Sequence, residues 1–194
     1  MKNLLLWVAA GFLFSSCGNH SPEPPKTTTE EKSFFPVAEY IQGEIKVVDS
    51  MPVGILKKTI RGNKKDSGFI ERPEFHSLAS EFISPELSKT ELEKNYNENS
   101  FADQSTENFT FTYSPLKPDA VKFGRIDVLV KPGQTSDKVR SIYLERSYVR
   151  QDTTVNERLY WKANSSFSIT TEKKYKEKEP IIEQLIVIWN PSNY

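Results

Sequence analysis

The chain has 194 residues, of which 37% are hydrophobic and 27% charged, values ordinary for a globular protein. Its 26 Lys and Arg residues balance 26 Asp and Glu residues, so it lacks the basic excess typical of nucleic-acid-binding proteins, and we expect no nucleic-acid partner. Its single cysteine excludes an internal disulfide.

The beginning of the chain follows the order of a secretory leader. One positive side chain, Lys2, precedes an apolar run from Leu4 to Phe14. This run is too short to span a bilayer as a helix, which needs about 20 residues. Small residues, Ser15 and Ser16, follow the run. The three-part pattern predicts a signal peptide over residues 1–16.

The stretch Leu13-Phe14-Ser15-Ser16-Cys17 resembles the lipobox of bacterial lipoproteins, although Phe14 stands where that family usually has leucine. The resemblance implies cleavage between Ser16 and Cys17, a diacylglycerol thioether on the Cys17 sulfur and an acyl chain on its new amine. Two or three acyl chains anchor a protein stably in a membrane, whereas one chain binds reversibly. The alternative is a plain signal peptide followed by an unrelated cysteine.

Residues 18–33, GNHSPEPPKTTTEEKS, contain three prolines, three threonines and several charges, but no other apolar residue. Such a segment cannot bury enough surface to offset the entropy lost on ordering. We therefore predict that residues 17–33 are the lipidated cysteine and a flexible tether, which reaches at most roughly 50–55 Å when extended.

The residues after Cys17 also bear on localisation in the cell envelope. In lipoproteins of this kind an aspartate directly after the cysteine signals retention in the inner membrane, and Gly18 stands there instead. The resemblance therefore implies the outer membrane. Glu23 and the pair Glu30-Glu31 lie too far from Cys17 to match the acidic cluster of surface lipoproteins, which favours the periplasmic face over the cell surface.

Residues 34–194 predict a single globular α+β domain that begins with helices. One helix face is formed by Val37, Tyr40, Ile41, Ile45 and Val48. A second apolar stripe follows Pro73 and runs from Phe75 to Ile83, and a capping box at Ser88 to Glu91 predicts a short third helix to about Tyr96. Between the first two helices, residues 53–71 predict a β-hairpin with a polar turn at Gly62.

The second half of the domain predicts an antiparallel meander of about six strands. After a predicted loop over residues 95–104, apolar and polar residues alternate in segments joined by short polar turns. These segments are residues 109–113, 126–130, 139–150, 154–162, 167–175 and 181–189. We expect the helices and the hairpin to pack on one face of a sheet that curves into a partial barrel around them.

Few side chains of the domain are suited to catalysis or metal binding. Its one histidine, His76, falls at the border of the second apolar stripe, where a half-buried histidine is common. No phosphate-binding glycine loop and no nucleophile elbow occurs in the sequence. We predict no catalytic residue, metal site or cofactor. A carboxylate-based hydrolase stays an alternative, because its paired acids can be distant in sequence.

Five cations fall within nine residues around the predicted hairpin tip. They are Lys57, Lys58, Arg61, Lys64 and Lys65. One interpretation is contact with anionic headgroups or an acidic partner. The other is a solvated hairpin whose lysines protect a sheet edge from pairing with another chain.

The predicted meander is rich in aromatic residues. These residues could form the core under the helices or line an apolar ligand site. They are Tyr143, Tyr148, Tyr160, Trp161, Phe167, Tyr175 and Trp189. The mature chain resembles small envelope lipoproteins of Bacteroidota-type bacteria in its Lys, Asn, Ser and Thr-rich texture and its Phe35-Pro36-Val37 and Asp49-Ser50-Met51-Pro52 segments. We expect a non-enzymatic envelope lipoprotein that binds an envelope protein or an apolar ligand. The alternative is a lipid or lipoprotein carrier with an apolar cup.

Overall fold

A computed structural model describes residues 34–194, so the predicted signal peptide, the lipobox and the tether lie outside the described residues. The helices are α1 (Val37–Ser50), α2 (Arg72–Ala79) and α3 (Lys89–Asn95), with 3-10 turns η1 (Ser80–Phe82), η2 (Pro85–Leu87), η3 (Pro118–Ala120) and η4 (Pro191–Asn193). The strands are β1 (Ile55–Arg61), β2 (Lys64–Ile70), β3 (Tyr96–Asp103), β4 (Asn108–Pro115), β5 (Arg125–Lys131), β6 (Lys138–Arg150), β7 (Thr153–Lys162), β8 (Ser166–Tyr175) and β9 (Ile181–Ile188). Within this part of the chain, no helix is long and apolar enough to cross a bilayer.

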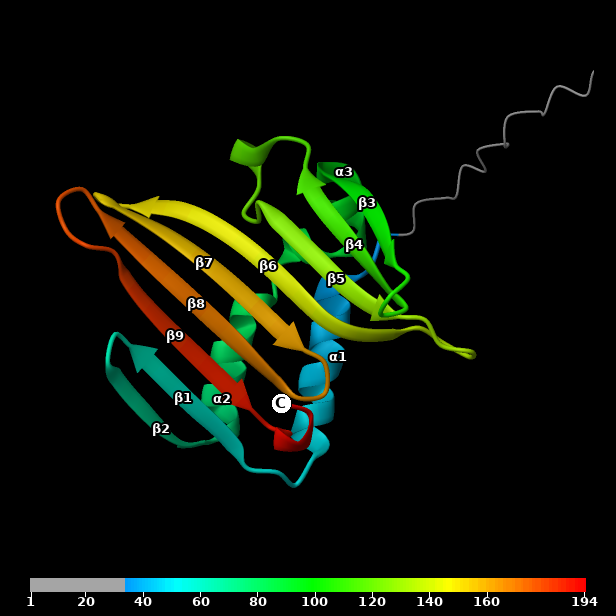
Figure 1. Cartoon of the computed structure of the whole chain (residues 1–194), viewed down its shortest axis with the longest axis horizontal. Coiled ribbons are helices and arrows are strands. Elements are labelled where there is room, and N and C mark those ends of the chain that lie inside the picture. The colour runs from blue at the N-terminus through cyan, green and yellow to red at the C-terminus, as the bar shows by residue number, and fades with distance from the viewer. Residues whose placement is uncertain (1–33) are drawn as a thin grey trace, which may run out of the picture. The chain divides into compact units, whose positions relative to one another are not determined.

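The nine strands form one open antiparallel sheet in the order β2-β1-β9-β8-β7-β6-β5-β4-β3, with β2 and β3 at its edges (Figure 1). From β3 to β9 each strand pairs with the next one along the chain, which is the predicted meander. Helices α1 and α2 lie behind the sheet in the view of Figure 1. The α+β class and the antiparallel meander are therefore confirmed.

The predicted loop over residues 95–104 is wrong, because most of it forms the edge strand β3. Its pairing with β4 runs without interruption from Tyr96 opposite Pro115 to Asp103 opposite Asn108. The strand was hidden because its residues, YNENSFAD, are mostly polar and exposed. An edge strand has fewer buried positions than a central one, so its sequence shows little alternation.

The predicted packing of the hairpin on one face of the sheet is also wrong, because the hairpin extends the sheet. Strand β1 pairs with β9 from Leu56 opposite Ile188 to Arg61 opposite Glu183. Together with β3, the two hairpin strands raise the predicted six strands to nine. Strands that meet edge to edge satisfy their backbone hydrogen bonds in the ladder, which packing on a face would leave unpaired.

One hydrophobic core fills the space between the helices and the sheet. Its centre is an aromatic cluster whose members are at most 2% exposed: Phe75, Phe82, Trp161, Phe167 and Trp189. The Phe82 ring, from η1, lies 5.2 Å from that of Trp161 and 5.1 Å from that of Phe167, measured between ring centroids. For the two tryptophans and Phe167, the interpretation as core is confirmed.

Candidate functional site

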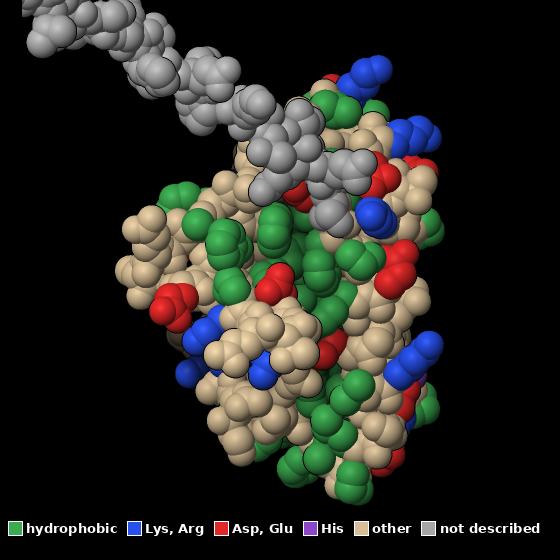
Figure 2. All heavy atoms as spheres, turned by 90° about the vertical axis from the view of Figure 1, so that its right-hand side faces the viewer, with side chains coloured by type: hydrophobic (Ala, Val, Ile, Leu, Met, Phe, Trp, Pro, Cys, Tyr) green, Lys and Arg blue, Asp and Glu red, His purple; other side chains and the backbone are tan. Residues whose placement is uncertain are grey.

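A groove of about 850 Å³ lies at the end of the sheet where α1 begins and β7 turns into β8. Its apolar and aromatic lining consists of Phe35, Tyr40, Leu129, Val139 and Tyr160. Its charged lining consists of Asp137, Lys138, Arg140 and Lys162. The end of the molecule on the right of Figure 1 shows hydrophobic side chains gathered at its centre, with charged side chains around them (Figure 2).

Strand alternation places Tyr160 and Lys162 in this groove. Successive side chains of a strand point to opposite faces, and Trp161, between them, is buried in the core. Tyr160 is 40% exposed and lines the groove on the other face. Tyr160 and Trp161 therefore divide between surface and core by their alternation along β7.

A β-bulge shapes the wall that β6 contributes. Leu129 of β5 is opposite Ser141 of β6, whereas the next residue, Val130, is opposite Val139. Arg140 is thus the extra residue of the bulge, and it lines the groove. Bulges commonly re-aim a side chain near a functional site.

Contacts from α1 hold the other wall in place. A carboxylate oxygen of Glu44 accepts a hydrogen bond from the backbone N–H of Asn164, in the turn between β7 and β8, at 2.7 Å. The Tyr40 ring lies 5.6 Å from that of Phe35. Burial, followed by the charge of Glu44, raises the pKa of Tyr40 above its ordinary value.

The structure separates the five cations around the hairpin tip. Lys57 pairs with Glu74 of α2, and Arg61 pairs with Glu183 of β9 at 2.9 Å. Lys58 extends over the ring of Tyr194, with its Nζ 5.6 Å from the centroid. The remaining two, Lys64 and Lys65, are exposed on the edge strand β2.

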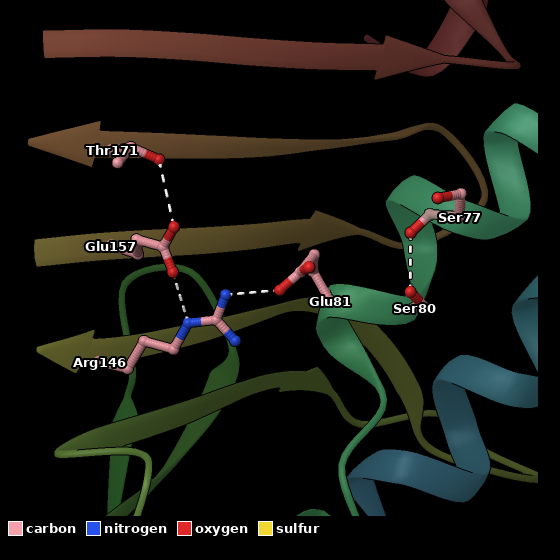
Figure 3. Close-up of polar contacts among 6 residues, drawn as sticks. All are labelled: Ser77, Ser80, Glu81, Arg146, Glu157 and Thr171. Atoms are coloured by element: carbon pink, nitrogen blue, oxygen red, sulfur yellow. Dashed lines mark hydrogen bonds and ion pairs between the residues drawn. The ribbon is translucent and has the colours of Figure 1, made fainter. Parts of the chain in front are cut away.

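A second candidate, which sequence reasoning missed, is a buried ion cluster around Arg146 of β6 (Figure 3). Its side chain is only 7% exposed, and it donates hydrogen bonds to Glu157 of β7 through Nε and to Glu81 of η1 through Nη2, each at 2.5 Å. Glu157 also accepts a hydrogen bond from Thr171 at 3.4 Å. Burial opposes the charge of Arg146, but the hydrogen bonds to both carboxylates outweigh it and raise its pKa.

The charged groups of this ion cluster bind one another. Both Glu81 and Glu157 accept a hydrogen bond from the same guanidinium, so the two acids that converge here are already engaged. A cavity of about 470 Å³ lies beside them, lined also by Val121, Lys122 and Tyr148. The contacts connect η1 to the centre of the sheet, and we assign them to the stability of the fold.

His76 lies on the surface of α2, where its Nε2 is 2.8 Å from a carboxylate oxygen of Asp49 on α1. The histidine side chain is 48% exposed, and the contact joins the two helices. In residues 34–194, no group of three or more His, Cys, Asp or Glu side chains is placed to hold a metal ion.

No protein-family model matches the chain, and no curated protein matches it in sequence. Among the described residues, the groove is the feature on which a functional proposal can be based.

Proposed function

We propose that this protein is a lipid-anchored lipoprotein of the cell envelope, and that its domain binds an apolar ligand in the groove between α1 and the ends of β4 to β7. The groove carries the proposal. Ligand sites are typically concave, about 300–1,000 Å³ in volume, and lined by apolar and aromatic side chains with a few polar groups. The groove, at about 850 Å³, has this size, and its apolar and aromatic residues lie beside a comparable set of charged and polar ones.

The position of the groove supports a link to the membrane. Phe35 lines it, and the predicted tether ends at residue 33. The groove therefore includes one of the first described residues of the domain, which follow the predicted tether in the chain. A tether of roughly 50–55 Å would keep this surface within reach of the bilayer.

The packing under the helices favours the groove over an internal cup. The rings of Phe75, Phe82 and Phe167 fill the space between the helices and the sheet. A carrier that held its ligand beneath the helices would have to displace this core, whereas the groove is already open.

The anchor is tested by Cys17→Ala. We expect this substitution to abolish labelling by an alkyne-tagged palmitate and to release the protein from the membrane fraction, because the thiol is the predicted attachment atom. Ser15→Ala, which keeps a small residue, should still be labelled. Labelling of Cys17→Ala equal to that of the wild type would contradict the anchor.

The groove is tested by photo-crosslinking in the intact envelope. We expect a benzophenone amino acid at Leu129, in the groove, to form an adduct with the mass of a lipid when the full chain is irradiated in its native membrane. The control position is Ile182 of β9, which is 55% exposed and outside the groove. Equal lipid adducts at both positions, or none at Leu129, would contradict the proposal.

A further inference from the structure

We propose that the ligand of the groove is an anionic lipid, whose headgroup lies against Lys138, Arg140 and Lys162 and whose chain follows the apolar lining. This inference rests on the proposed function above, and it adds the charge and the chemical class of the ligand.

Charge complementarity is the first argument. Three cations line the groove with one acid, Asp137, so the lining has an excess of positive charge. Among the described residues, the charged nitrogen atoms of Lys138, Arg140 and Lys162 form no ion pair with a carboxylate oxygen at 4.0 Å or less. An anion brought into the groove would therefore meet cations that are not already neutralised by contact.

The hairpin provides the contrast. There, Lys57 and Arg61 are held by Glu74 and Glu183, and Lys58 lies over an aromatic ring. These contacts engage three of the five cations around the hairpin tip, and the other two, Lys64 and Lys65, are exposed on the edge strand β2. The groove cations come instead from the start of β6 and the end of β7, which are brought together only by strand pairing.

The arrangement of apolar and charged residues is the second argument. On the face of the sheet opposite the helices, Leu129 of β5 and Lys162 of β7 both lie opposite Ser141 of β6, and Tyr160 lies two residues before Lys162. A ligand here would contact apolar and cationic side chains at once. An anionic lipid offers both kinds of surface, whereas a free anion offers only charge.

A lipid is favoured over an acidic peptide by the sheet topology. Extended peptides commonly bind by adding a strand to a sheet edge, where free backbone groups supply hydrogen bonds. The edges of this sheet are β2 and β3, and no residue of either strand lines the groove. The strands that do line it are already paired on both sides.

The test compares two single-chain lipids of equal chain length, palmitoyl-lysophosphatidylglycerol and palmitoyl-lysophosphatidylcholine, titrated into the full-length protein and followed by native mass spectrometry. We expect the anionic lipid to bind at least about tenfold more tightly than the zwitterionic one. The triple variant K138Q/R140Q/K162Q should lose this preference and keep its affinity for the zwitterionic lipid.

The matched control is R61Q/K64Q/K65Q, which removes three charges around the hairpin tip, outside the groove, and should keep the preference. Thermal melting checks that both triple variants are folded. Equal affinities for the two lipids in the wild type, an equal loss in both triple variants, or displacement of the lipid by inorganic phosphate would overturn the inference. Failure of the wild type to bind either lipid would instead reject the proposed function.

Discussion

Replacing Arg146 with methionine should lower the free energy of unfolding by about 3–5 kcal/mol, because it removes one partner from a buried ion pair. Glu157 would keep its charge in a site where its side chain is only 11% exposed. Leaving Glu81 without its partner should cost less, because its side chain is 47% exposed and can turn towards water. Urea denaturation of the wild type and of Arg146→Met measures the difference.

Two companion variants distinguish a buried charge from a merely lost contact. Glu81→Gln should cost no more than about 1 kcal/mol, as expected for a partly exposed ion pair. The double variant Arg146→Met with Glu157→Leu should recover most of the stability, because apolar side chains can replace a buried pair at little cost. A loss in Arg146→Met no larger than that in Glu81→Gln would show that the cluster does not stabilise the fold.

The expected effect follows from what the cluster holds in place. Glu81 lies in η1, directly before Phe82, whose ring contacts those of Trp161 and Phe167. The ion pair between Glu81 and Arg146 thus connects the surface of η1 to β6, and the next residue of η1, Phe82, packs in the core. Loss of Arg146 should loosen this turn as well as leave Glu157 uncompensated.

The elements with strong apolar periodicity could be predicted from the sequence. Helix α1 begins at Val37 and ends at Ser50, as the spacing of its buried face indicates. The central strands of the meander also lie where alternation predicts them, because each has one face in the core. Strand β3 could not be found this way, because as an edge strand it buries few side chains.

The groove could not be predicted, because its walls come from segments far apart in the chain. Phe35, Leu129 and Tyr160 meet only after the sheet has formed and α1 has packed against it. The bulge that makes Arg140 an extra residue depends on pairing between β5 and β6, and no turn or glycine marks it. The sequence predicted that the aromatic residues of the meander form either a core or a ligand site. On β7 the two neighbours differ, because Trp161 is buried in the core and Tyr160 lines the groove.

The ion cluster, in contrast, had a signal in the sequence. Arg146 follows Leu144 by two residues, and Glu157 precedes Leu159 by two, so both charges occupy positions that alternation assigns to the core face. Two opposite charges at such positions on adjacent strands predict a buried pair. Charged residues at positions where alternation predicts apolar ones therefore indicate the pair of Arg146 and Glu157.

The most direct test of the central claim, that the groove holds an apolar ligand, is native mass spectrometry of the full-length protein purified from its own membrane. Ala163→Trp adds a large ring to the groove lining, and Ala120→Trp adds the same ring at an exposed position of η3 outside the groove. We expect the wild type and Ala120→Trp to retain a bound lipid and Ala163→Trp to lose nearly all of it while melting as the control does. Equal lipid occupancy in all three proteins, or none in the wild type, would contradict the claim.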